Sequence, residues 1–376
     1  IHNYEFLKGN EMVNKLKVRA SYGRTGKASF PAYAATTMYE ALFDEWYATG
    51  FGAVLKALGN NNLTWEKTDK FNVGIEMQFL NRRLTVDADY YHDKTIDLVN
   101  DVSLSQTSGF SSYKDNMGEV LNQGFELQVR GEVFRNRDWL VALWGNMAHN
   151  KNKILKISDS QRAYNQRVKE FYENIVNEEY GRYNSKYGVP ISQYEEGQSL
   201  TSIWAVKSLG IDPTTGKEIF LNRDGSVSDT WNATQEVAVG NTEPKFNGSI
   251  GFNAAYKQWS LFAAFQYEWG GQEYNQTLVD RVENARIQYQ NVDLRVLTDR
   301  WKQPGDIAQF KDIKNADSAT MPTSRFVQDK AYLRLSALTL SYDFNREWIK
   351  KYLGMNMLRL EASTRDFINW NSIRQE

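Results

Sequence analysis

The sequence predicts an all-β protein, a large antiparallel β-barrel that spans a membrane with one apolar face against lipid. Two observations carry this prediction. Apolar and polar residues alternate over nine long segments of the chain, which is the period of strands with one apolar face. The connections between these segments are short and long in strict alternation. In an up-and-down sheet, this alternation gathers the short turns at one end and the long loops at the other.

Each expected strand is justified by its own alternation. The clearest case is 70–79, where an apolar residue occupies every second position, and the alternation resumes at 84 after a short polar break. A tilted membrane strand needs about 9–11 residues, whereas strands of soluble proteins average about 5–6. In order along the chain, the expected strands are 16–22, 70–79, 84–98, 125–133, 139–147, 246–256, 259–267, 332–342 and 357–364.

The apolar positions of these strands are the expected contact with lipid. The residues assigned to this lipid-facing surface are Phe71, Val73, Ile75, Met77, Val86, Phe125, Leu127, Ile250, Phe252, Leu261 and Phe265. The apolar stripes also end in aromatic residues, which favour the boundary between lipid and water. The expected aromatic girdle consists of Tyr22, Phe79, Tyr90, Tyr256, Trp259 and Tyr267.

The long connections are expected at 23–69, 99–123, 148–245 and 270–331. Compact soluble domains rarely contain structureless loops of this length, but membrane barrels do. Within the third loop we expect a hairpin at 202–222 and a polar helix at 166–188. The aromatic run at 39–51 suits either platforms for sugar rings, contact with another protein, or local packing. The connection 343–356 is expected to form one or two helical turns.

The sequence offers no catalytic set and no metal site. The chain has no Cys, and His2, His92 and His149 lack the spacing of metal ligands. The segment GIDPTTGKE has five residues between its glycines rather than the four of a phosphate loop, so a tight turn at 212–216 is expected instead. In LNRDGSVSD, a hairpin turn at Asp224 and Gly225 is expected rather than a calcium loop. We therefore expect neither an enzyme nor a cofactor.

Composition narrows the choice of partners. The net charge is −1, so nothing indicates nucleic-acid binding. No stretch approaches 18 consecutive apolar residues, which excludes a transmembrane helix. The mean hydropathy of −0.61 is typical of soluble proteins, but alternation hides a spanning barrel from any averaged scale. The alternatives are a soluble β-sandwich or β-helix with the same stripes around a core, a secreted glycan-binding or adhesin domain, and a passive porin.

Several segments resemble the SusC/RagA family of TonB-dependent outer-membrane transporters. They are KLKVRASYGRTG, LTWEKTDKFNVGIEMQFLNRRLTVDADYYHDKTIDLV, NMGEVLNQGFELQV, TEPKFNGSIGFNAAYKQWSLFAAFQYEWGG and AYLRLSALTLSYDF. The resemblance implies a barrel of the 22-stranded type in the cell outer membrane of a Gram-negative bacterium, with short periplasmic turns and long extracellular loops. It also implies import of a nutrient oligosaccharide or peptide, a SusD-like surface lipoprotein as a lid, and TonB as the source of energy.

The resemblance covers only the C-terminal part of such a barrel. We therefore expect residues 1–376 to form part of one barrel domain, and the chain to be a portion of a longer transporter. No segment resembles the N-terminal plug, the region that contacts TonB, or the small N-terminal extension, so TonB is expected to act through the missing plug region. No residue of this chain is assigned to the solute.

Overall fold

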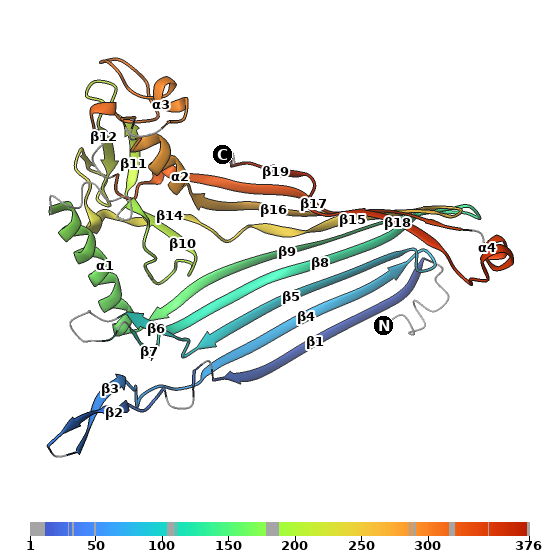
Figure 1. Ribbon diagram of the computed structural model, residues 1–376, viewed down its shortest axis with the longest axis horizontal. Helices are drawn as coiled ribbons and strands as arrows, with labels where there is room; N and C mark the ends of the chain where they lie inside the picture. Colours follow the sequence, from blue (N-terminus) through green and yellow to red (C-terminus); the bar gives the residue numbers. More distant parts are fainter. Residues whose placement is uncertain are drawn as a thin grey trace.

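The chain forms one large antiparallel sheet in the computed structural model (Figure 1), as the sequence predicted. The structure describes residues 12–28, 30–31, 34–48, 50–103, 110, 112–177, 188–285, 287–288, 291–315, 320–344 and 346–373. The 10 strands of the large sheet are β1 Val13–Lys27, β4 Glu66–Phe79, β5 Leu84–Ile96, β8 Gly118–Arg135, β9 Trp139–Ile157, β15 Phe246–Tyr256, β16 Trp259–Tyr274, β17 Val327–Asp343, β18 Arg359–Thr364 and β19 Asn369–Asn371.

Each strand of this sheet pairs with the next one along the chain, which confirms the up-and-down topology. Both β18 and β19 pair with β17, so the last strand is one strand interrupted between Thr364 and Asn369. Asp366 in this interruption has a φ of 50°, in the left-handed region, which breaks the ladder locally. The sequence did not predict β19, because its three residues are too short to show a period.

Most predicted strands were too short, chiefly at the loop end, but β5 ends at Ile96 and β18 begins at Arg359, each two residues inside its predicted bounds. β8 has 18 residues and β9 has 19, so the loops are shorter than 99–123 and 148–245. The same holds for 23–69 and 270–331, since β1, β4, β16 and β17 also extend into them. These extensions lack the apolar stripe on which the prediction rested, and their backbone ladders continue regardless of it.

The long loops contain their own small elements. Hairpins form from β2 Met38–Tyr47 and β3 Gly50–Ala57, and from β6 Val99–Ser103 and β7 Ser112–Asn116. The third loop holds α1 Asp159–Asn177, β10 Ser202–Ala205, β11 Lys207–Ile211, β12 Glu218–Leu221, β13 Val227–Ser228, η4 Ala233–Gln235 and β14 Val237–Asn241. The fourth holds α2 Gln276–Leu278, η5 Val279–Glu283, α3 Arg295–Thr298, η6 Ile313–Asn315 and η7 Ser324–Phe326.

Several local predictions are confirmed. β11 and β12 form the predicted hairpin, and the amide of Gly216 donates to the carbonyl of Asp212 at 2.8 Å in the predicted tight turn. The amide of Gly225 donates to the carbonyl of Asn222 at 3.0 Å, closing the turn between β12 and β13. The predicted polar helix is α1, which begins earlier than expected, and residues 178–187 of that prediction lie outside the described residues. α4 Arg346–Leu353 supplies the expected helical turns.

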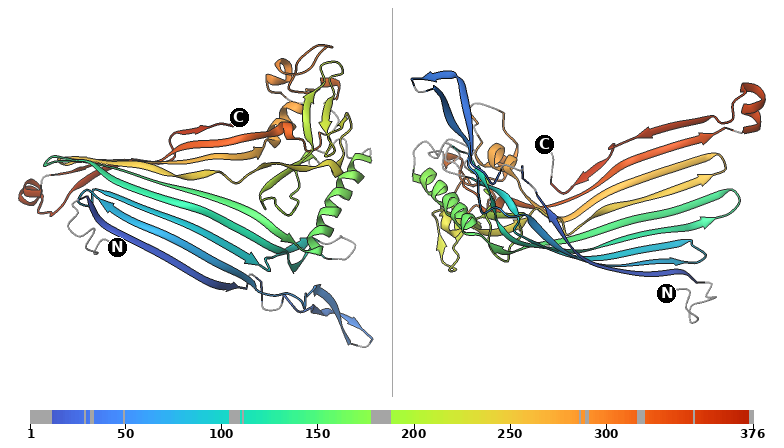
Figure 2. Two further views of the ribbon diagram at one scale, coloured as in Figure 1. Left: turned by 180° about the vertical axis from the view of Figure 1, so that it is seen from behind. Right: turned by 90° about the horizontal axis from the view of Figure 1, so that it is seen from below.

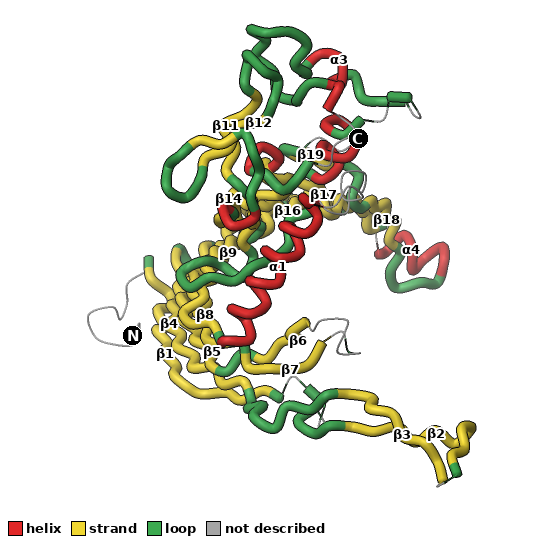
Figure 3. The backbone as a smooth tube through the Cα atoms, turned by 90° about the vertical axis from the view of Figure 1, so that its left-hand side faces the viewer, coloured by secondary structure: helices red, strands yellow, loops and turns green. Residues whose placement is uncertain are grey.

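The two ends of the sheet are different. Figures 1 and 2 show the short turns and α4 together at one end, and the loop elements at the other. Seen end-on, the sheet is an arc with α1 and the β6–β7 hairpin on its concave side (Figure 3). Among the described helices, none has the length and apolar character needed to cross a bilayer. The buried apolar clusters lie in the loops, around Val282 and Tyr172, and not between layers of sheet.

Candidate functional site: a two-faced wall and its loop cap

The register of the sheet places apolar side chains on one face and polar side chains on the other. Because neighbouring residues on a strand point to opposite faces, residues paired across strands share a face. One row of paired residues on the apolar face is Val18, Ile75, Ala88, Leu127, Met147, Gly248, Tyr267 and Leu333. The neighbouring row on the polar face is Lys17, Glu76, Asp87, Gln128, Asn146, Ser249, Gln266 and Arg334.

Every residue predicted to face lipid lies on the apolar face. No described layer of protein covers this face: Ile250 is 48% exposed and Phe71 is 40% exposed in the middle of long strands. An apolar surface of this extent is not left open to water by a soluble protein. The polar face instead carries ion pairs between strands, such as Lys15 with Glu76 at 2.6 Å and Lys70 with Asp93 at 3.0 Å.

Aromatic side chains stand at both ends of the apolar face. Towards the loops, the rings of Phe125, His149, Phe246 and Trp269 follow one another at centroid distances of 5.4, 5.4 and 6.1 Å. At the turns, the ring centroids of Tyr256 and Trp139 are 4.4 Å apart, and those of Trp259 and Tyr342 are 4.8 Å apart. The 11 residues of β15 thus run from one aromatic end to the other, roughly 33 Å along the strand or 25 Å along the normal at a tilt of about 40°.

The residues of the predicted girdle are placed as follows. Tyr22 and Tyr90 lie at the loop end of the apolar face, and Phe79, Tyr256 and Trp259 lie at the turn end. Tyr267 lies one row further in, where its hydroxyl crosses Gly248 and donates to the carbonyl of Asn146 at 3.0 Å. Trp269 and Trp139, which the sequence reasoning missed, complete the two aromatic ends. The sequence contained a signal for both. Trp269 follows Tyr267 by two residues and so continues the alternation, and Trp139 is the first residue of β9.

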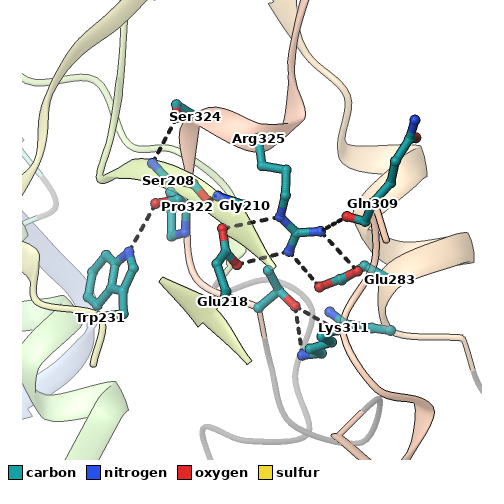
Figure 4. Close-up of polar contacts among 12 residues, drawn as sticks. Ser208, Gly210, Glu218, Trp231, Glu283, Gln309, Lys311, Pro322, Ser324 and Arg325 are labelled. Carbon is teal, nitrogen blue, oxygen red and sulfur yellow. Dashed lines mark hydrogen bonds and ion pairs between the residues drawn. The ribbon is translucent and has the colours of Figure 1, made fainter. Parts of the chain in front are cut away.

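The third and fourth loops fold together into one cap. Val206 and Thr323 form a parallel bridge, and the indole of Trp301 donates to the carbonyl of Pro213 at 2.8 Å. At the centre is Arg325, whose guanidinium bonds Glu283 at 2.6 Å and Glu218 at 2.8 Å (Figure 4). Burial opposes its charge, but the two carboxylates hold the pKa of Arg325 above its ordinary value. This ion cluster therefore ties η5, β12 and η7 to one another.

The cap contains a further buried carboxyl, that of Glu236. Glu236 is 1% exposed, and its Oε2 accepts from the amide of Gln193. Its Oε1 has no hydrogen-bond partner among the described residues. Burial raises the pKa of Glu236 to about 8, and the opposing effects of the Gln193 hydrogen bond and of the Lys169 and Arg223 charges only partly offset it. The protonated form thus suits this position.

The cap is attached to the polar face of the sheet. The carboxylate of Glu243 accepts from the side chain of Asn150 and from the backbone amide of Asn152 at 3.3 Å. On the same face, the hydroxyl of Tyr91 donates to Asn150 at 2.8 Å. By contrast, the β2–β3 hairpin projects away from the sheet (Figure 3). Its Phe43 and Phe51 meet edge to face at 5.4 Å and remain exposed, so local packing uses only part of their surface.

The comparisons with known proteins agree with this geometry. The family described as TonB dependent receptor-like, beta-barrel, matches residues 11–363. The "TonB-dependent receptor P3" of Formosa agariphila is 26% identical over 97% of this chain and 36% of its own length. The "TonB-dependent receptor SusC" of Bacteroides thetaiotaomicron is 31% identical over 42% of this chain and 16% of its own length. This chain therefore spans a little over a third of the length of relatives such as P3.

Solved structures show the same fold. A structure of the RagAB peptide transporter matches 99% of this chain and 39% of that chain, with a TM-score of 0.77 at 22% identity. A structure of the RagAB peptide importer in the "closed-closed" state matches with a TM-score of 0.78. The family lies in the outer membrane and consists of transporters, not enzymes, which sets aside the soluble secreted domain. The chain belongs to the TonB-dependent receptor-like β-barrel family, and its homologues are of the SusC/RagA type.

Proposed function

We propose that this chain is the C-terminal part of the barrel wall of a TonB-dependent importer that takes up a nutrient oligosaccharide or peptide. The observation that supports this most directly is the segregation of the two faces across the register of one sheet. Acyl chains suit the exposed apolar face between its aromatic ends, and water suits the charged and amide side chains of the other. In this arrangement the lipid-facing residues seal the membrane, and the polar face lines the interior.

The wall itself is passive in this proposal. Its ladders and ion pairs keep it rigid, while the cap over the polar face offers the first contact with solute. A plug outside this chain opens the path, and TonB supplies the energy through that plug. The classes of solute rest on the resemblance, and the name of the RagAB peptide transporter supports a peptide for that protein.

A SusD-like surface lipoprotein is the proposed lid. The exposed aromatic hairpin formed by β2 and β3 and the cap stand at the same end of the sheet (Figure 1), where a lid closes over the interior. Tyr39, Phe43 and Phe51 supply apolar surface for such a contact, since aromatic side chains are enriched in protein interfaces.

The test is purification of the complete transporter from its own outer membrane. We expect a surface lipoprotein to co-purify, and calorimetry with defined oligosaccharides and peptides to show binding of one class. Uptake of that solute should stop when TonB is deleted. Uptake that continues without TonB contradicts the proposed function, and binding of neither class contradicts the proposed solute.

A further inference from the structure

The connection between β17 and β18 is the longest of the turn-end connections, and it holds the helix α4. Trp348 and Tyr352 lie on one side of α4, one helical turn apart, and are 50% and 64% exposed. Ile349 on the adjoining side is fully buried and fixes the helix to the protein. The helix is therefore held in place while it presents two aromatic side chains outward.

A continuous series of ring contacts joins α4 to the apolar face of the sheet. Tyr342, next to Trp259 on that face, lies 4.9 Å from Phe344. The ring centroids of Phe344 and Trp348 are 6.5 Å apart, and those of Trp348 and Tyr352 are 5.8 Å apart. The series continues the turn-end aromatic residues of the sheet onto the helix, so the exposed side of α4 adjoins the surface assigned to lipid. Aromatic side chains with one apolar and one polar end favour that boundary.

The charge of the turn end complements a phospholipid surface. The exposed basic residues of the described turns are Arg82, Arg83, Arg137, Lys257, Lys350 and Lys351, against the exposed acids Asp138 and Glu347. Two of these lysines stand beside exposed tyrosines: Lys257 Nζ is 5.2 Å from the ring centroid of Tyr256, and Lys351 Nζ is 5.3 Å from that of Tyr352. A lysine beside an interfacial ring can reach a lipid phosphate while its stem stays on the apolar surface.

We propose that α4 is an interfacial helix that rests on the periplasmic leaflet, with Trp348 and Tyr352 at the acyl boundary. Lys351 and Lys257 bind the head groups of anionic phospholipids there. Lys350 points away from this side of the helix and faces water. This inference rests on the proposed function, because it needs the apolar face of the sheet to lie in a bilayer. An amphipathic segment with aromatic residues on one side and lysines beside them is typical of interfacial anchors.

The chain has no Cys, which permits a depth measurement with spin labels. The complete transporter, with any Cys elsewhere replaced, is labelled at Y352C, at K350C and at F252C, and placed in nanodiscs of phosphatidylethanolamine and phosphatidylglycerol. We expect the labels at 352 and 252 to be accessible to oxygen and shielded from a water-soluble nickel chelate. The label at 350 should show the reverse.

The three labels separate the possible failures. If the label at 352 is as accessible to nickel as the label at 350 while the label at 252 is exposed to lipid, the proposal of an interfacial helix is wrong. The assignment of the barrel wall is then unaffected. Nickel access at 252 overturns the proposed function itself. Native mass spectrometry then tests the head groups: K257E with K351E should retain at least a few-fold less phosphatidylglycerol than the unchanged protein. K302E in the cap is the matched control, and equal retention by both variants contradicts the binding of anionic lipid by these lysines.

Discussion

The guanidinium group of Arg19 on β1 crosses over Gly74 on β4 and bonds Asp89 on β5. Its Nε donates to Oδ1 of Asp89 at 3.2 Å, and its Nη1 donates to Glu76 at 2.7 Å. A Cβ atom on Gly74 would lie 2.3 Å from Oδ1 of Asp89 and 2.4 Å from Nε of Arg19. The absence of a side chain at Gly74 is therefore what lets one charge pair connect three strands of the polar face.

Gly74→Val should displace Arg19 and separate it from Asp89. The added side chain needs the space that the guanidinium occupies, so both charged groups must move. We expect a lower midpoint temperature of thermal unfolding for the complete barrel. The midpoint is measured on gels, on which the folded and the unfolded barrel migrate differently. Gly23→Val on the same face is the control, because a Cβ there has no neighbour within 4 Å. Equal midpoints for the two variants would show that the crossing contributes nothing.

Ile75→Arg tests the assignment of the apolar face to lipid. An Arg on the lipid side of a barrel costs roughly 2–4 kcal/mol near the bilayer midplane, and Ile75 lies midway between Phe71 and Phe79 on β4. We expect impaired assembly in the outer membrane and a lower free energy of unfolding in lipid. Gln78→Arg, three residues away on the polar face, should be well tolerated. The assignment fails if both variants assemble as the unchanged protein does.

The sequence predicted the sheet well because a sheet with one apolar and one polar face requires a period of two along each strand. Residues 70–79 alternate without interruption, and 246–256 alternate up to Ala254; both segments form strands of the sheet. The resemblance to a known family supplied what alternation alone left open, namely which side of the membrane each end faces. The extended ends of β8 and β9 escaped prediction because apolar and polar residues do not alternate there, even though Val120 and Ile154 on them are buried.

The cap could not be predicted in the same way, because its contacts join residues far apart in the chain. Arg325 bonds Glu218 across more than a hundred residues, and nothing local to either residue indicates the other. The buried position of Glu236 is likewise a product of packing between η4, β14 and the segment that carries Gln193. Only the short-range features of the cap, such as the turn at Asp212 and the helix α1, had a signal in the sequence.

Arg325→Met should loosen the cap strongly. It leaves the carboxylate of Glu283, which is fully buried, and that of Glu218 without their cation. Removing one partner of a buried ion pair typically costs about 3–5 kcal/mol. We expect faster proteolysis and faster amide exchange in β12 and η7, with the sheet unchanged. If Glu218→Gln and Glu283→Gln, added to Arg325→Met, restore the protection, the loss is due to the unpaired charges. If Arg325→Met alone leaves the protection unchanged, the ion cluster does not stabilise the cap.

The cap should also lose stability as the pH rises from about 4.5 to about 8, and the loss should level off at higher pH. Because burial raises the pKa of Glu236 to about 8, the folded cap holds a proton that the unfolded chain releases near pH 4.5. Its contribution is complete below the unfolded pKa and is lost as the pH rises through the folded pKa. After correction for the intrinsic pH dependence of exchange, protection of α1 should fall between pH 5 and pH 9.

Glu236→Gln should abolish this part of the pH dependence, since Gln remains neutral and has nearly the same shape. Glu195→Gln is the matched control, because Glu195 is half exposed and lies 3.9 Å from Arg223. A protection profile for Glu236→Gln that still falls with pH as in the unchanged protein would rule out this carboxyl as the titrating group.

The length of β8 and β9 has a consequence for what can approach the cap. Beyond His149, β9 continues to Ile157, which adds about eight residue steps or roughly 26 Å of strand. At a tilt of about 40°, the end of β9 lies roughly 20 Å beyond the loop-end aromatic boundary. A partner that approaches the cap along this edge of the sheet meets the exposed side chains of Lys151, Lys153 and Lys156 before it reaches the aromatic boundary.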